Sequence, residues 1–421
     1  MSVVNSENRT FLVNASFLAL IQAANLFLPL LTFPYLIRVL GVELFGILAL
    51  ATAVMHYVNV IIDYGFNLTA TRDVARIRND KAALSQLFST VQFIKINLVI
   101  LCAFCLVIVH LFTSFLGSYS TLYWLTFFSV VANGLFPIWL FQGMEKMRVV
   151  SILMVISKLF FTIFIFFLVD SRQDYLIVPL LNVVGSSLTF IIGLFLAVKL
   201  FDLHWYTPIT SRVISQLGGS WYVFLSQLKI TLFSNTNVVI LGFFSGPLAV
   251  GYYVSAEKIM RALALLQTPI TQALYPQISQ TIRVSPDEAI FRLRHIAFYG
   301  VWSYGVLLMT VFIMADWGCV LLFGSEGEYI AELLRIMLPI PLFIFLNNIF
   351  GTQIMLNLGR DRAFFRALLS IALISLVLCL ALSFSYQAYG AALALLMSEL
   401  ALVSTFAFLA RDIFFSKTSL L

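Results

Sequence analysis

The sequence predicts an all-α polytopic membrane protein of twelve transmembrane helices, in two six-helix lobes related by a pseudo-two-fold axis along the membrane normal. Three observations support this prediction. Of the 421 residues, 61% are hydrophobic and only 10% are charged, and the mean hydropathy is +1.01, far outside the range of soluble globular proteins. The apolar residues form long runs. The basic residues gather in every second gap between these runs.

The number of helices follows from the apolar runs. About 20 apolar residues are needed for one helical crossing of a bilayer, and the chain holds twelve runs of this kind. They lie at 11–37, 43–69, 84–112, 119–141, 149–169, 175–200, 218–244, 248–279, 295–315, 329–357, 364–384 and 388–410.

The loops between these runs predict the orientation. Cytoplasmic loops of membrane proteins are enriched in Lys and Arg. With the N-terminus inside, the inner segments hold 17 basic residues and the outer segments hold only Arg38 and Arg172. The sequence therefore predicts that both termini are cytoplasmic. Arg9 precedes a long apolar run with no small-residue cleavage site after it, so we expect no cleaved signal peptide.

Two pairs of similar sequence segments predict an internal repeat. In both 40–51 and 241–256 a Leu-Gly pair is followed by a second Gly after an apolar residue and then by an Ala, and 141–148 resembles 357–362. Because each half holds an even number of crossings, the two halves share one orientation and form a parallel repeat. The predicted organisation is an N-terminal lobe 1–200 (helices 1–6), a cytoplasmic linker 201–217 and a C-terminal lobe 218–421 (helices 7–12).

Prolines inside three of the predicted spans predict bends, because proline removes a backbone donor and kinks a helix. Bent helices suit a transporter whose halves rock. The prolines are Pro29 and Pro34 in helix 1, Pro269 and Pro276 in helix 8, and Pro339 and Pro341 in helix 10.

Charged residues inside the predicted spans are candidates for function, since they are costly in a bilayer. Lys258 and Arg261 are three residues apart and share one helix face, and a guanidinium can hold a phosphate through two parallel hydrogen bonds. Six interior bases outnumber four interior acids, so they cannot all pair. We expect five of the bases to line a cationic cleft that binds a pyrophosphate or an acidic sugar: Lys95, Lys158, Lys229, Lys258 and Arg261.

Structural interpretations of the same residues stay open. Glu257 and Arg261 are four residues apart and can neutralise each other, and long lysine side chains can reach toward the membrane surface. Three interior carboxylates, Asp63, Glu257 and Glu399, are candidates for carrying the coupling ion. Carboxylates of this kind are equally suited to pairing with a base on a neighbouring helix, and this interpretation is favoured, most strongly for Asp63, where the flanking Gly65 and Asn67 indicate a helix end.

Signatures of other protein classes are missing. The four histidines are far apart, and no metal-binding or nucleotide-binding motif occurs. We therefore expect no catalytic residue, no metal and no cofactor. The net charge of +6 is spread between apolar runs, which argues against a nucleic-acid partner. Cys102 and Cys105 form a C-x-x-C inside an apolar helix, where small buried side chains are expected rather than a redox pair.

Five stretches together resemble Wzx-type O-antigen flippases of the multidrug/oligosaccharidyl-lipid/polysaccharide superfamily, in its polysaccharide-export branch. The resemblance covers nearly the whole chain. The stretches are FPYLIRVLGVELFGILALA at 33–51, DYGFNLTATRDVARIR at 63–78, WLFQGMEKMR at 139–148, NVVILGFFSGPLAVGYYVSAEKI at 237–259 and ALYPQIS at 273–279.

The resemblance implies a function. Such proteins move an undecaprenyl-pyrophosphate-linked sugar repeat unit from the cytoplasmic to the periplasmic leaflet of the bacterial inner membrane, by alternating access of two lobes around a cationic cavity. An ion gradient or the membrane potential would drive the movement, and a polysaccharide polymerase and a chain-length regulator are the implied protein partners. Similar flippases carry cavity cations on the helices that correspond to those of Lys229, Lys258 and Arg261.

Three alternative functions fit the sequence less well. A multidrug or cation antiporter of the same superfamily would call for a negatively charged cavity, whereas this one is predicted to be positive. A membrane-embedded O-antigen polymerase or ligase would need a large outer loop, and the longest outer gap is only about 316–328. A channel would not need two halves with bent helices.

Overall fold

The computed structural model describes residues 27–112 and 117–414, and all regular secondary structure in these ranges is helical. Both chain ends and the start of the predicted span 11–37 lie outside them. The chain divides into two compact units, Met1–Thr236 and Asn237–Leu421, named the N-unit and the C-unit below. Their boundary falls inside a long helix, whereas the sequence places the joint at 201–217, so that linker stays a prediction.

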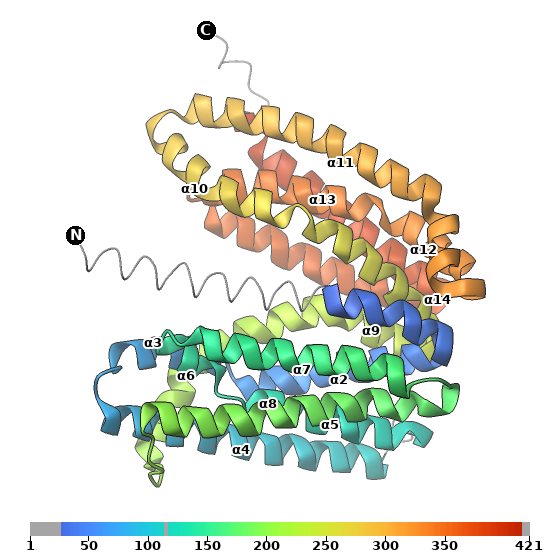
Figure 1. Cartoon of the computed structure of the whole chain (residues 1–421). Coiled ribbons are helices and arrows are strands. Elements are labelled where there is room, and N and C mark those ends of the chain that lie inside the picture. The colour runs from blue at the N-terminus through green and yellow to red at the C-terminus, as the bar shows by residue number, and fades with distance from the viewer. Residues whose placement is uncertain (1–26, 113–116, 415–421) are drawn as a thin grey trace. The chain divides into compact units, whose positions relative to one another are not determined.

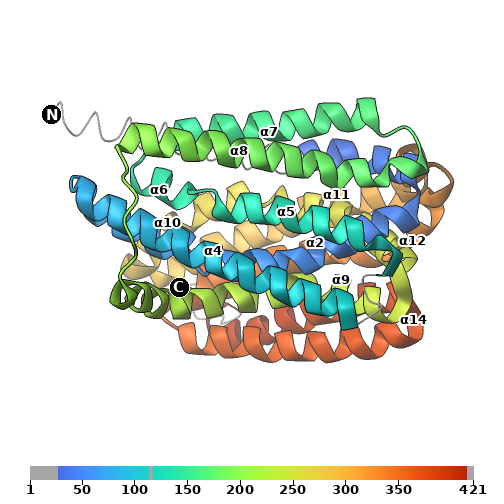
Figure 2. The ribbon, with the colours of Figure 1, turned by 90° about the horizontal axis from the view of Figure 1, so that it is seen from below.

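The N-unit is a bundle of long helices. α5 lies between α2 and α8, and α7 lies beside α8 (Figures 1 and 2). The described part of the first helix is Phe27–Leu40. It is followed by α2 (Val42–Asp63), α3 (Phe66–Arg76), α4 (Lys81–Phe112), η1 (Gly117–Tyr119), α5 (Ser120–Leu135), α6 (Ile138–Gly143), α7 (Met147–Leu168), η2 (Arg172–Leu176) and α8 (Ile177–Phe201).

The C-unit holds most of the longest helical runs. α9 (Thr210–Leu265) begins in the N-unit and continues into the C-unit. The remaining elements are α10 (Thr268–Val284), α11 (Pro286–Phe323), η3 (Gly324–Glu326), α12 (Gly327–Met337), α13 (Pro339–Asn347), the π-helix η4 (Asn348–Leu356) and α14 (Asp361–Phe414).

Eight helical runs in the described residues are long and apolar enough to cross a membrane, so the chain is a multi-pass membrane protein, as predicted. Two of the longest helices contain a non-helical residue. In α9 this is Gly246, with φ 79°, and in α14 it is Gln387, with φ 49°. Both breaks lie between predicted spans, at 244–248 and 384–388. The full count of twelve crossings and the pseudo-two-fold axis stay predictions.

Two of the six prolines predicted to bend a helix lie where a helix begins. Pro269 is at the start of α10 and Pro339 is the first residue of α13. At a helix start the missing N–H of proline has no intrahelical partner to lose, and its fixed φ suits the first turn. Pro276 is inside α10. The predicted single span 248–279 is therefore two helical pieces.

A break between α2 and α3 positions residues of the site described below. Tyr64 and Gly65 both have left-handed backbone conformations, with φ of 48° and 79°. A side chain at Gly65 would lie 2.8 Å from the Val223 Cγ1 atom of α9. The Tyr64 ring stacks on Phe224 with centroids 4.7 Å apart, and Thr69 bonds Ser220 at 2.7 Å. The first half of α9 thus packs directly on this break, which ends α2 at Asp63.

Each unit has its own apolar core. In the N-unit, Phe66 of α3, Phe88 of α4 and Trp139 of α6 are almost completely buried in one cluster. In the C-unit, Ile354 of η4 and Phe406 of α14 belong to a second cluster that joins α10, α11 and α13.

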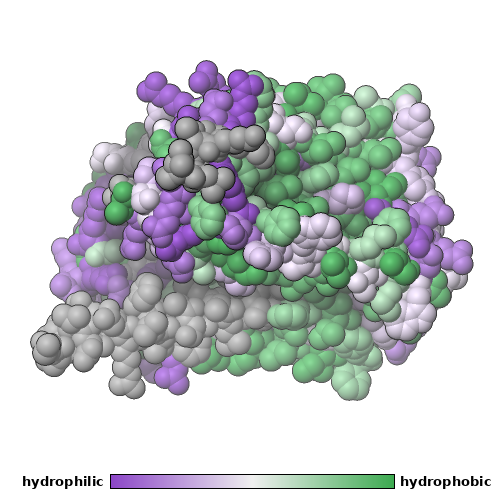
Figure 3. Space-filling model, turned by 90° about the horizontal axis from the view of Figure 1, so that it is seen from above, coloured by the Kyte–Doolittle hydropathy of each residue, from purple (hydrophilic) through white to green (hydrophobic). Residues whose placement is uncertain are grey.

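The outer surface is apolar as well. Figure 3 shows one face of the molecule, where hydrophobic side chains form a broad field with hydrophilic side chains toward its ends. α11 alone exposes Phe298, Trp302, Phe312 and Trp317. Exposed apolar areas of this extent are abnormal for a soluble protein and suit contact with lipid.

Candidate functional site

A polar cavity lies inside the N-unit. It consists of two adjoining pockets of about 440 Å³ and about 200 Å³. Asn59 of α2, Asn133 of α5 and Lys158 of α7 line both pockets. The cavity is therefore enclosed mainly by α2, α5, α7 and α8, and we name it the N-unit cavity.

The polar residues of this cavity come in helical stripes. On α2 they are spaced by three or four residues, so they fall on one face. α5 and α8 carry shorter stripes of the same spacing. The stripes are Thr52, His56, Asn59 and Asp63 on α2; Thr126, Ser129 and Asn133 on α5; and Asn182, Ser186 and Thr189 on α8. Apart from Asp63, these residues are uncharged and were not predicted from the sequence, where only charged residues were taken as site candidates. Their spacing within otherwise apolar runs is the signal that would have revealed them.

Many donor groups of the cavity wall are bound to their own helices. The Thr126 hydroxyl donates to the Leu122 carbonyl at 2.8 Å, and the Asn133 amide donates to the Ser129 carbonyl at 2.9 Å. The hydroxyls of Thr52, Ser186 and Thr189 also donate to carbonyls four residues earlier. A hydroxyl that has donated its hydrogen keeps its oxygen as an acceptor, and an amide keeps its oxygen and a second N–H. The wall is therefore rich in acceptors, which suits a ligand with many hydroxyl donors.

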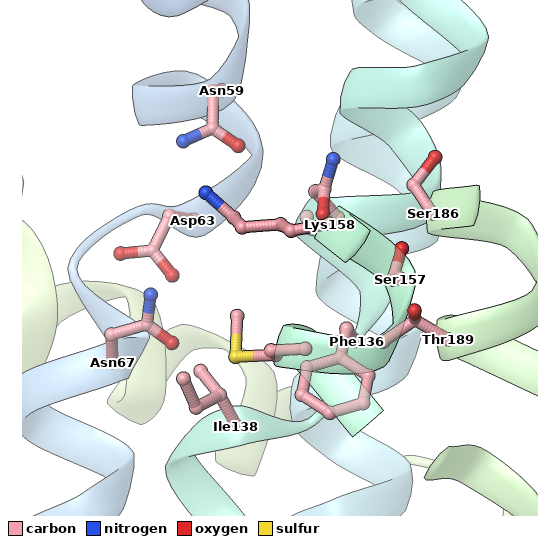
Figure 4. A pocket seen from close by; sticks show the side chains of 12 residues that line it. Asn59, Asp63, Asn67, Phe136, Ile138, Ser157, Lys158, Ser186 and Thr189 are labelled. Atoms are coloured by element: carbon pink, nitrogen blue, oxygen red, sulfur yellow. The ribbon is translucent and has the colours of Figure 1, made fainter. Parts of the chain in front are cut away.

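Lys158 provides the cavity's positive charge. Figure 4 shows its side chain extending from α7 across the smaller pocket toward Asp63 and Asn59. It makes no hydrogen bond or ion pair with the part of the chain that the structure describes. An ammonium held in a polar cavity in this way is available to an anionic group of a ligand.

Asp63 and Lys95 form an ion pair at the cavity wall. The Lys95 side chain is only 1% exposed, and its Nζ atom lies 3.4 Å from Asp63 Oδ1. The same ammonium donates to the Gly134 carbonyl at 2.9 Å. The structure thus gives Asp63 a lysine partner on a neighbouring helix, which is the interpretation favoured from the sequence. Lys95 lies behind the wall, whereas Asp63 lines the smaller pocket.

The C-unit holds a separate group of charged residues. Arg261 donates to Glu257 at 2.7 Å, which is the neutralising pair anticipated from their spacing. Glu399 of α14 accepts a hydrogen bond from the Asn347 amide at 2.7 Å and interacts electrostatically with Arg261. Two carboxylates on different helices, those of Glu257 and Glu399, therefore both interact electrostatically with the Arg261 guanidinium.

The other two predicted bases are on α9. Lys229 belongs to the N-unit and has an exposed side chain, and it does not line the N-unit cavity. Lys258 belongs to the C-unit and is half-buried beside Glu257. Within the N-unit, Lys158 is the predicted base that lines this cavity. In the described residues no group of three or more metal-ligating side chains occurs.

Comparison with known proteins links the chain to one family. The family model described as "Polysaccharide biosynthesis protein" matches residues 11–282. The chain is 32% identical over 403 residues to a protein of Escherichia coli strain K12 named "Putative O-antigen transporter", covering 94% of this chain and 95% of the relative. A Shigella dysenteriae protein with the same name is 29% identical, with coverage of 93% and 97%.

Solved structures share the fold. The lipid II flippase MurJ, in an inward closed conformation, superposes with a TM-score of 0.70 at 15% identity, covering 93% of this chain and 87% of that one. An inward-facing multidrug resistance transporter of the MATE family and the MOP superfamily gives a TM-score of 0.61 at 16% identity, with coverage of 95% and 98%. At these identities the likeness concerns the fold.

Proposed function

Because this chain belongs to the polysaccharide biosynthesis protein family, we propose that it is a flippase for lipid-linked O-antigen sugars. The family match and the O-antigen relatives confirm the resemblance found in the five sequence stretches. The proposed substrate is an undecaprenyl-pyrophosphate-linked repeat unit, moved from the cytoplasmic to the periplasmic leaflet of the bacterial inner membrane. The proposed protein partners are a polysaccharide polymerase and a chain-length regulator.

The N-unit cavity is the observation that supports this proposal most. It places amide and hydroxyl oxygens and one lysine between helices whose outward-facing surfaces are apolar. Sugar hydroxyls are hydrogen-bond donors, and the acceptor-rich wall offers them partners. Lys158 would hold an acidic sugar or the pyrophosphate. The polyprenyl tail would stay in the lipid while alternating access of the two lobes presents the headgroup on the other side.

Lys158 is the residue on which we base the first test. The experiment is complementation of a flippase-deficient strain, with surface polysaccharide scored at matched protein levels. A hydrogen bond to a charged group contributes about 1.5–3 kcal/mol, so Lys158→Ala should weaken substrate binding roughly 10- to 100-fold and reduce surface polysaccharide. Lys158→Arg should retain most activity. Lys199→Ala is the matched control, since Lys199 lies over the Phe195 ring and outside the cavity. Full activity of Lys158→Ala would refute this role.

The α9 bases are proposed as further substrate contacts. Lys258→Ala and Arg261→Ala are compared in the same assay with Lys258→Arg and Arg261→Lys. The alanine variants should lose activity and the charge-conserving variants should keep it. Full activity in both alanine variants would remove α9 from the proposed site. Lys95 is proposed to position Asp63 at the cavity wall, since its ammonium is already bound.

Coupling to an ion gradient is proposed for the interior carboxylates. Glu257 and Glu399 both interact with Arg261. Binding of a proton or cation to one carboxylate therefore changes the affinity of the other for a proton or cation. Asp63 is the candidate in the N-unit. Translocation in vesicles with imposed pH or sodium gradients should lose its ion dependence when the responsible carboxylate is changed to Gln or Asn. Unchanged dependence in all three variants would refute this assignment.

A further inference from the structure

A second cavity of about 380 Å³ lies at one end of the N-unit, away from the N-unit cavity. Its walls come from the C-terminal end of α3, the first turns of α4 and the start of α9. We propose that this cavity is a binding site for the phosphate group of a membrane lipid, held by Arg76 and Arg212. We name it the arginine cavity.

Each wall of the arginine cavity is one face of a helix. On each helix the lining residues follow the i, i+3, i+4 pattern, as expected for residues on one face of a helix. The lining residues are Asp73, Arg76 and Ile77 on α3; Ala83, Gln86, Leu87 and Thr90 on α4; and Arg212, Ser215 and Gln216 on α9. Three helix faces therefore converge, and two of them bring an arginine.

The segment before α9 fixes the position of Arg212. The backbone N–H of His204 donates to Ser85 Oγ at 3.2 Å, and the N–H of Tyr206 donates to Ser89 Oγ at 3.0 Å. Both serines are on α4, one turn apart. The segment is thereby attached along α4, so α9 begins opposite the α4 face that lines the arginine cavity. Its arginine is positioned by fixed backbone contacts rather than by a free loop.

The charges in the arginine cavity favour an anion. The one acid, Asp73, is bound by Arg72 at 3.3 Å and by the Gln216 amide at 3.5 Å. Arg212 donates to the Gln86 side chain. Arg76 makes no hydrogen bond or ion pair with the described residues. Two guanidinium groups therefore face one acid that is already paired, and guanidinium groups hold phosphate oxygens through parallel hydrogen bonds.

The location of the arginine cavity identifies the class of ligand. The end of α3 and the start of α9 belong to segments that the sequence predicts to be cytoplasmic. Phosphate groups of lipids lie at this depth, and anionic lipids attract basic residues there. The phosphate group could come from an anionic phospholipid or from a polyprenyl pyrophosphate, and both present the same chemistry to the arginines.

The test measures binding to the purified full-length protein in phosphatidylcholine nanodiscs. One arm titrates farnesyl pyrophosphate, and the other measures retention of phosphatidylglycerol by native mass spectrometry. The double variant Arg76→Gln/Arg212→Gln should weaken binding of at least one probe tenfold or more. Arg76→Lys/Arg212→Lys should have an intermediate effect, because the charge remains and the paired hydrogen bonds are lost. Arg78→Gln is the matched control, since Arg78 pairs with Glu145 at 2.7 Å and does not line the cavity.

The two arms distinguish the sources of the phosphate group. Weaker binding of farnesyl pyrophosphate alone assigns the arginine cavity to the pyrophosphate lipid, and loss of phosphatidylglycerol alone assigns it to a phospholipid. Wild-type affinity of the Gln double variant for both probes would refute the proposal. If the double variant does not fold, the Lys double variant decides: wild-type affinity for both probes refutes the proposal, and weaker binding of either supports it. Transport is not measured, so the result is independent of the proposed flippase function.

Discussion

The ion pair of Lys95 and Asp63 leads to an asymmetric prediction for stability. Lys95 is 1% exposed and Asp63 is 17% exposed, because Asp63 faces the N-unit cavity and Lys95 lies behind it. Removing one partner of a buried pair typically costs about 3–5 kcal/mol, since a charge is left buried without compensation. Asp63→Ala leaves the ammonium with the Gly134 carbonyl, so we expect a cost near the lower end, about 3 kcal/mol.

The converse substitution should be milder. Lys95→Met removes the buried charge itself, and the remaining Asp63 carboxylate can be hydrated from the cavity. We expect a cost of about 1 kcal/mol, and a similar cost for the double variant Asp63→Ala/Lys95→Met, because replacing a whole buried pair by apolar groups is often close to neutral. The two single effects should therefore not add.

The assay for this prediction is thermal unfolding of the four proteins purified in one detergent. The expected order of melting temperature is wild type highest, Lys95→Met and the double variant close together below it, and Asp63→Ala lowest. Equal losses in the two single variants that add in the double variant would refute the reasoning, because that result would mean that the pair carries no coupling energy.

Two further predictions concern packing and pH. Gly193→Ala should destabilise the protein by about 1–3 kcal/mol through overpacking, since its Cβ atom would overlap the Phe136 ring. The control in the same unfolding assay is Gly305→Ala, where the new Cβ meets open space. Equal stability of the two variants would contradict the prediction. The Lys81 ammonium, which donates to Asp202 at 2.9 Å, holds the pKa of that carboxyl below its usual range. The stability that this ion pair contributes is therefore fully present at pH values above the ordinary aspartate pKa of about 3.9. It is lost as the pH falls through the depressed pKa of Asp202. The Asp202 carboxyl carbon should titrate at lower pH in the wild type than in Lys81→Gln when followed by NMR, and equal midpoints would exclude the interaction.

Helices were the part of the fold that the sequence predicted best. Apolar runs locate membrane-spanning segments because the bilayer requires about 20 apolar residues per crossing. The breaks at Gly246 and Gln387 also fell in predicted gaps, since polar or small residues interrupt the runs there. The beginnings of α10 and α13 were not predicted, because proline has the same sequence signature at a helix start as at a kink.

The site was predicted less completely. Lys95 and Lys158 look alike in the sequence, as single lysines in apolar helices. In the structure Lys95 is paired with Asp63 and does not line the N-unit cavity, whereas Lys158 does. Which of two lysines meets a carboxylate depends on which helix faces pack together, and that is decided by tertiary structure. The pair of Glu257 and Arg261 was predictable, because residues four apart on one helix are always neighbours.

For the substrate site proposed above, the acceptor-rich wall of the N-unit cavity has a consequence for the range of sugars that would bind. Where the Ser and Thr hydroxyl hydrogens are bound to the protein's own backbone, these residues can bind a ligand only through hydrogens that the ligand brings. Almost every hexose brings several, whether its hydroxyls are axial or equatorial. Such a wall distinguishes a hydroxyl from a deoxy or methylated position better than it distinguishes one stereoisomer from another. Changes in the composition of the sugar should therefore be tolerated more readily than loss of its hydroxyl groups.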